Sequence, residues 1–94
     1  MNLDKAKKRI AKKVKMGFQG FPKISISYTS SNSDLAEEVI IVFIAEEGLS
    51  PMEERFKSKS DAREDEVIQS AIVKMIERSE AKTVTLEEKI VIQS

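Results

Sequence analysis

The chain has 94 residues, of which 40% are apolar and 34% are charged, and this size allows one modest core but not two. It contains no Cys and no His, which excludes disulfides, thiolate chemistry and a Ser-His-Asp triad and removes the commonest general base and metal ligand. No apolar run approaches the roughly 18 residues that a membrane span needs. We therefore expect a single soluble domain, without a cofactor or metal, in a reducing, cytoplasmic setting.

The net charge of zero conceals an uneven distribution along the chain. Residues 1–23 hold eight Lys/Arg and one Asp, which gives +7, whereas residues 24–94 hold eight Lys/Arg and fifteen Asp/Glu, which gives −7. Such asymmetry is typical of a basic segment that binds a polyanion or docks on the acidic part of its own chain.

The first 16 residues predict a basic amphipathic helix over about 3–16, which could be peripheral to the core. Its apolar face recurs at three- and four-residue steps through Leu3, Ala6, Ile10 and Val14. Asn2 can cap its start, and Gly17 favours its end. The cations of this helix are the residues that we expect to contact nucleic acid or another anionic partner: Lys5, Lys7, Lys8, Arg9, Lys12, Lys13 and Lys15.

A Gly- and Pro-containing connector over 17–22 follows, in which we expect Phe18 and Phe21 to anchor the helix to the core. Residues 23–29 alternate apolar and polar side chains, which predicts a half-buried strand with Ile24, Ile26 and Tyr28 pointing inward. The polar residues 30–34 predict a turn.

Six consecutive β-branched or aromatic residues, from Val39 to Ile44, predict a second strand within residues 37–46. Because the run does not alternate, we expect both of its faces to be covered, either by a layer on each side or by a homodimer. A face left uncovered would instead form an apolar patch for a partner.

Two interpretations remain open for residues 50–60. The sequence Ser50-Pro51-Met52-Glu53 is typical of a capping box that starts a short helix. Alternatively, residues 55–59 form a short edge strand whose lysines discourage further pairing, and this is the interpretation we favour.

Residues 61–79 predict the second helix, with Asp61 and Glu64 at its cap. Its expected buried stripe consists of Val67, Ile68, Ala71, Ile72, Met75 and Ile76. Residues 83–86 and 90–92 then predict strand structure, with a kink or turn at 87–89. The fold class is therefore α+β: an N-terminal helix, a mainly antiparallel sheet of three or four strands, one long helix on the sheet, and a C-terminal strand.

The order of a helix, three strands and a helix resembles the layout of double-stranded-RNA-binding domains, with Pro22, Tyr28 and residues 58–63 at similar places. The resemblance implies cations on phosphate at the start of the last helix. This chain carries four acidic residues there, which would repel phosphate: Asp61, Glu64, Asp65 and Glu66. The resemblance is therefore one of layout alone, and fold does not imply function.

Two further patterns have simpler interpretations. Residues 17–20 have the letters of the GxxG loop of KH modules, but that loop joins two helices, whereas this one leads into a strand through Pro22. The same four acidic residues could gather Mg²⁺, but acidic first turns are common because they suit the helix dipole.

For function, the sequence favours a small non-enzymatic protein-interaction or accessory module with an unidentified protein partner. The alternative is a nucleic-acid-binding protein whose basic N-terminal helix contacts backbone phosphates. An enzyme is the third hypothesis and the least favoured, because no nucleophile, acid/base or phosphate-loop motif is present.

Overall fold

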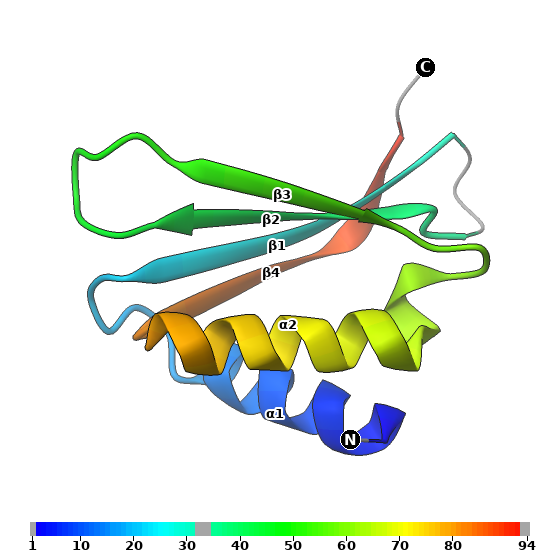
Figure 1. Cartoon of the computed structure of the whole chain (residues 1–94), viewed down its shortest axis with the longest axis horizontal. Helices are drawn as coiled ribbons and strands as arrows, with labels where there is room; N and C mark the ends of the chain where they lie inside the picture. Colours follow the sequence, from blue (N-terminus) through cyan, green and yellow to red (C-terminus); the bar gives the residue numbers. More distant parts are fainter. Residues whose placement is uncertain (1, 32–34, 93–94) are drawn as a thin grey trace.

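The computed structural model describes residues 2–31 and 35–92, apart from the side chain of Glu88. Figure 1 shows the order of the elements, which are α1 (Leu3–Lys15), β1 (Lys23–Ser30), β2 (Glu38–Ile44), β3 (Met52–Lys57), the 3₁₀ turn η1 (Ala62–Glu64), α2 (Glu66–Ser79) and β4 (Thr83–Ile92). The expected α+β class and order of elements are confirmed.

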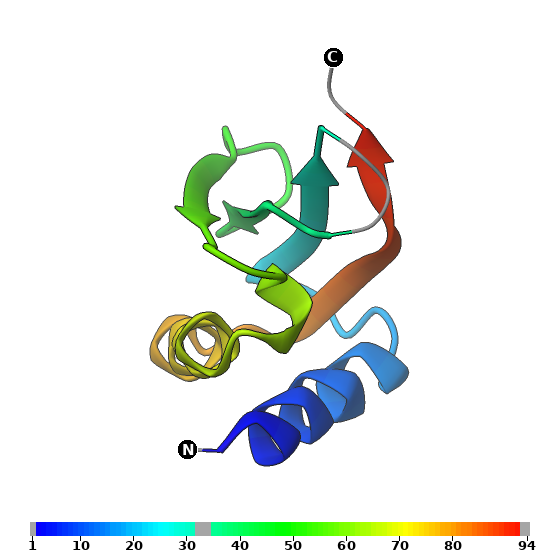
Figure 2. The same ribbon diagram turned by 90° about the vertical axis from the view of Figure 1, so that its right-hand side faces the viewer.

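The four strands form one mixed sheet in the order β3-β2-β1-β4. β2 pairs antiparallel with β1 and with β3, whereas β4 pairs parallel with β1. The parallel pair arises because α2 carries the chain back along the sheet, so that β4 starts at the same end as β1. Both helices lie on one face of the sheet, with α2 below β2 and β3 and α1 below β4 (Figures 1 and 2).

The core lies between this face and the helices. Alternate residues of paired strands share it: Ile24 is opposite Phe43, Ile26 is opposite Ile41, and Tyr28 is opposite Val39. Ile24, Ile26 and Tyr28 are buried, as the alternation predicted.

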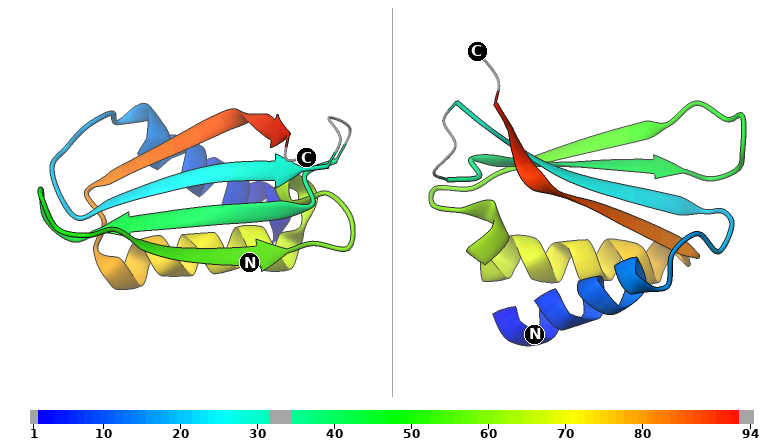
Figure 3. Two further views of the ribbon diagram at one scale, coloured as in Figure 1. Left: turned by 90° about the horizontal axis from the view of Figure 1, so that it is seen from above. Right: turned by 180° about the vertical axis from the view of Figure 1, so that it is seen from behind.

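The opposite face of the sheet has no described element over it, as the view from above shows (Figure 3). Ile40, Val42 and Ile44 point to this face, so the expectation that both faces of this strand are covered is wrong for the single chain. Ile40 is nevertheless only 8% exposed. Arg55 lies directly beside it on β3 and forms an ion pair with Glu38, two residues before Ile40 on the same face of β2.

The basic helix is docked on the core rather than free. Ala6 and Ile10 are fully buried, and Val14 packs against the same cluster. Asn2 caps the helix by accepting a hydrogen bond from the Lys5 N–H over 2.8 Å. Gly17 follows the last turn with φ at +70°, a conformation that glycine adopts without strain.

Of the two interpretations of residues 50–60, the strand is confirmed, although it begins at Met52 and ends at Lys57. Its mixture of Glu, Arg and Lys suits an edge strand, because charge there discourages pairing with another chain.

The expectation of one helix over 61–79 is wrong at its start. Asp61 caps the 3₁₀ turn, and a second cap, Asp65, accepts the Ile68 N–H and starts α2 at Glu66. Val67 therefore lies in the first turn and is 79% exposed, contrary to the predicted buried stripe. The buried face turns instead toward Gln69 and Val73.

Two loop and strand details also differ from expectation. Phe18 is 66% exposed and makes an edge-on contact with Phe21, so it does not anchor α1 in the core. The two segments predicted around residues 87–89 form one strand, β4, in which the pairing register with β1 shifts between Leu86 and Ile90. Such a bulge bends the strand, which explains the kink in the sequence pattern.

Candidate functional site

The seven cations of α1 fall into two sets. Three of them contact the chain's own acceptors. Lys7 Nζ lies 2.6 Å from Glu64 Oε1, Arg9 Nη1 lies 3.3 Å from Glu77 Oε1, and Lys13 Nζ reaches the Ala81 carbonyl at 3.5 Å. These contacts join α1 to η1, to the last turn of α2 and to the segment between α2 and β4.

The other four lysines, Lys5, Lys8, Lys12 and Lys15, point away from the core. Their spacing of three, four and three residues places them along one face of the helix, opposite Ala6 and Ile10. The row is about 15 Å long at the rise of an α-helix. No described carboxylate pairs with any of their ammonium groups. We call this set the lysine row.

A groove of about 520 Å³ runs between α1 and the edge strand β4. Lys8, Lys12 and Lys15 stand at its rim, while the aliphatic side chains of Ala11, Val14 and Leu86 line its floor. The cations and the apolar floor run in the same direction because both follow the axis of α1.

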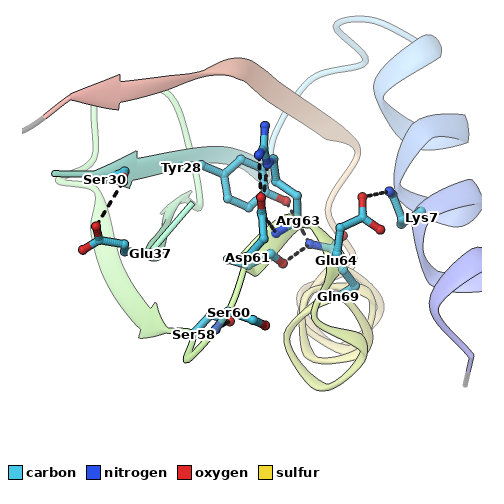
Figure 4. A network of polar contacts seen from close by, with 11 residues as sticks. Lys7, Tyr28, Ser30, Glu37, Ser58, Ser60, Asp61, Arg63, Glu64 and Gln69 are labelled. Atoms are coloured by element: carbon cyan, nitrogen blue, oxygen red, sulfur yellow. Dashed lines mark hydrogen bonds and ion pairs between the residues drawn. The ribbon is translucent and has the colours of Figure 1, made fainter. Parts of the chain in front are cut away.

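The groove continues at Lys8, Ala11 and Leu86 into a larger hollow of about 690 Å³ that is lined by residues of α1, β1, α2 and β4 and by the turn around η1. Two buried polar side chains, Tyr28 and Gln69, form the polar part of its wall. Gln69 Nε2 donates to the Tyr28 hydroxyl and to the Ala62 carbonyl, each over 2.9 Å. Figure 4 shows these contacts beside the Lys7–Glu64 ion pair.

Asp61 and Arg63 complete the mouth of the hollow. The Asp61 carboxylate accepts hydrogen bonds from the Arg63 backbone N–H and from Nε, each over 2.9 Å. The hydrogen bond from the Arg63 side chain lowers the pKa of Asp61 and, reciprocally, raises the pKa of Arg63. The pair is therefore ionised at neutral pH.

Burial raises the pKa of the Tyr28 phenol above its ordinary value, because the phenolate would lose hydration. The Gln69 hydrogen bond and the positive charges of Lys7 and Arg63 act in the opposite direction but do not cancel the effect of burial. Tyr28 is thus a neutral hydroxyl at neutral pH and can donate a hydrogen bond.

The serines near residues 30 and 58 and their acidic neighbours have local structural roles. The Ser31 hydroxyl donates to Glu37 Oε1 at 2.6 Å and, with a smaller effect from the Ser30 hydroxyl at 3.2 Å, lowers the pKa of Glu37. Ser58 donates to Asp65 at 2.9 Å, next to the start of α2. Across the part of the chain that the structure describes, no three acidic residues gather into a metal site.

The Gly17–Gly20 loop is held by β4. The Gln19 N–H donates to Thr83 Oγ1 over 2.8 Å, and the Thr83 hydroxyl donates to the Gly20 carbonyl over 2.7 Å. Its backbone thus closes onto the core, which agrees with a helix stop and turn.

The structure therefore unites only part of the predicted cation set on one exposed face: Lys5, Lys8, Lys12 and Lys15. It adds Tyr28, Arg63 and Gln69, which sequence reasoning did not connect with a site. Gln69 lies within a predicted helix and has no motif, so only the tertiary arrangement identifies it.

Comparisons with family models, with curated proteins and with solved structures give no match for this chain. Among residues 2–31 and 35–92, no helix has both the length and the apolar character needed to cross a bilayer.

Proposed function

We propose that this chain is a non-enzymatic protein-interaction module that binds an acidic, partly apolar segment of a protein partner along α1. The observation that carries the proposal is the lysine row beside the groove between α1 and β4. The acidic residues of the segment would face the lysines, and its apolar residues would fill the floor.

The division of the cations within α1 supports an external partner. Arg9 and Lys13 already contact α2 and the residues after it, and Lys7 contacts η1. The lysine row, by contrast, stays in solvent with four positive charges along about 15 Å. Such a field attracts acidic partners and speeds their association, more strongly at low salt.

The apolar floor favours a protein segment over a nucleic-acid backbone. Ala11, Val14 and Leu86 offer aliphatic surface between the lysines and the sheet edge. Leu, Ile or Val side chains of a peptide would bury that surface, whereas a sugar–phosphate backbone has no comparable groups. β4 is an edge strand, so an extended segment has room to lie alongside it.

A nucleic acid is the second candidate, and the straight alignment of the lysine row favours it. If the four lysines neutralise four phosphates, the binding constant falls with salt with a logarithmic slope of about −3.6, or about 150-fold between about 50 and 200 mM.

The test is a fluorescence-anisotropy titration with three labelled probes: an acidic peptide alternating Glu and Leu, a peptide of equal charge alternating Glu and Ser, and duplex nucleic acid. The proposal predicts that the Glu/Leu peptide binds more tightly than the Glu/Ser peptide. It also predicts that the Glu/Leu peptide loses less affinity at about 200 mM salt than the nucleic acid does.

Two matched triple variants each remove three positive charges, one from the lysine row and the other from elsewhere on the surface. Replacing Lys8, Lys12 and Lys15 with Gln should lower the affinity for the Glu/Leu peptide by about tenfold or more. The control replaces the exposed Lys57, Lys59 and Lys74 with Gln and should leave that affinity within about twofold. Equal losses in the two triple variants, or tighter binding of the nucleic acid with a steep salt slope, would overturn the proposal.

A further inference from the structure

We infer that the hollow between α1, η1, β1 and β4 is a binding site for a small amphipathic molecule that carries one anionic head group, either a carboxylate or a phosphate. The relationship that suggests this is a buried hydroxyl donor, Tyr28, beneath a mouth that holds Lys7, Lys8 and Arg63. The hollow shares Lys8, Ala11 and Leu86 with the groove, but the inference does not rest on the proposed peptide function, because it depends on Tyr28, Lys7 and Arg63, which do not line the groove.

The polar part of the wall consists of two buried side chains that hold each other in place. Tyr28 is 5% exposed and Gln69 is 3% exposed, and both border the hollow. The Tyr28 oxygen accepts from Gln69, which fixes the ring and leaves the phenolic hydrogen available. No described residue accepts that hydrogen, so a ligand oxygen in the hollow would take it.

The charges at the mouth favour an anion. Three cations, Lys7, Lys8 and Arg63, face two carboxylates, Asp61 and Glu64, which leaves an excess of one positive charge. Arg63 is held by Asp61, and none of the described carboxylates pairs with Lys8. Lys7 is paired with Glu64 at a surface position where the two side chains are 42% and 58% exposed. Exposed ion pairs of this kind are weak, so a ligand oxygen can compete with Glu64 for Lys7.

The remaining wall is apolar, with contributions from Ile10, Ala11 and Leu86. The volume of about 690 Å³ lies within the range of small-molecule sites. A ligand with a short alkyl body and an anionic end would place the body against this wall and the oxygens near Tyr28, Lys7 and Lys8. The carboxylate and phosphate classes share this chemistry and differ in the number of oxygens that the mouth has to meet.

The experiment is an NMR titration of the ¹⁵N-labelled full chain with hexanoate, hexyl phosphate and hexan-1-ol. We expect saturable shifts of the Gln69 side-chain amide and of the Arg63 Nε resonance with at least one of the anions. Hexan-1-ol should bind about tenfold or more weakly, because it lacks the charge-assisted contacts. The tighter of the two anions assigns the head group.

Matched single variants locate the site. Lys8→Gln should weaken the tighter anion about two- to fivefold, while Lys5→Gln, on the same helix face but outside the hollow, should not change its affinity. Tyr28→Phe should weaken it about tenfold. The inference is wrong if neither anion gives saturable shifts at Gln69, if hexan-1-ol binds as tightly as the anions, or if Lys5→Gln and Lys8→Gln have equal effects.

Discussion

The Tyr28 hydroxyl on β1 and the Gln69 amide on α2 are joined by a buried hydrogen bond of 2.9 Å. The same amide nitrogen donates to the Ala62 carbonyl of η1, so one side chain connects the sheet, the helix and the 3₁₀ turn. Because both N–H groups of the amide are used inside the core, the pair fixes where α2 lies relative to β1.

Removal of the hydroxyl should therefore destabilise the fold. Tyr28→Phe keeps the ring but leaves one buried Gln69 N–H without an acceptor, which should lower the free energy of unfolding by about 1–3 kcal/mol in a urea titration. Ser27→Ala, which removes a hydroxyl from the other face of β1, should change it by less than about 0.5 kcal/mol. In a double-mutant cycle with Gln69→Leu, the two effects should differ from additivity by about 1 kcal/mol. Simple additivity would show that the two groups do not interact.

Tyr28 should also ionise at a higher pH than an ordinary tyrosine. The chain contains one Tyr and no Trp, so the near-ultraviolet absorbance of phenolate reports this residue alone. We expect the folded protein to titrate at a pKa above the ordinary value of about 10, because burial disfavours the phenolate, and the denatured protein to titrate near that value. Identical curves for the folded and denatured protein would contradict the burial of the hydroxyl.

The raised pKa of Tyr28 makes the stability of the fold depend on pH in the alkaline range. Above about pH 10 the unfolded chain loses the phenolic proton while the folded chain keeps it, so the folded state binds more protons. Stability should then fall as the pH rises, until Tyr28 also ionises in the folded state. Tyr28→Phe should show a smaller decrease over the same interval when unfolding by urea is followed at several pH values.

At acidic pH, the stability that the charge of Asp61 contributes should be lost as the pH falls. The Arg63 hydrogen bond lowers the pKa of Asp61 in the folded state, so its contribution is present above the unfolded value of about 3.9 and is lost as the pH falls through the folded value. Asp61→Asn retains an oxygen to cap η1 and should cost about 1 kcal/mol at pH 7.

That difference between Asp61→Asn and the unaltered chain should shrink as the pH is lowered below the ordinary Asp value of about 3.9. Glu54→Gln, at an exposed position of β3, is the matched control and should have little effect at either pH. A cost for Asp61→Asn that stays constant with pH would mean that the charge of Asp61 does not stabilise the fold.

The local elements of this fold are strongly encoded in the sequence. The alternation around Ile24, Ile26 and Tyr28 gave the inward face of β1, and Asn2 and Gly17 bounded α1, because caps and periodicity act within a few residues. That the sheet face carrying Ile40, Val42 and Ile44 is left uncovered could not be predicted from the sequence. Whether a layer covers a strand depends on where distant elements pack, and in this fold both helices pack on the opposite face of the sheet.

The candidate site shows the same limit. The sequence indicated a basic helix face, but it could not divide the cations between the chain's own acids and solvent, since Glu64 and Glu77 lie far from Lys7 and Arg9 along the chain. The hollow depends on Tyr28 and Gln69, which are 41 residues apart. Val67 was misassigned because a second cap at Asp65 moved the start of α2.

The measurement that tests the central proposal most directly is the affinity of the Ala11→Lys variant for the Glu/Leu peptide. Ala11 is exposed on α1 in the floor of the groove, and Ala and Lys are both good helix formers, so the variant should fold normally. If apolar residues of an acidic partner occupy the floor, the added lysine should weaken the peptide by about threefold or more despite its favourable charge. Unchanged or tighter binding would contradict the proposal, because it would mean that charge alone holds the partner.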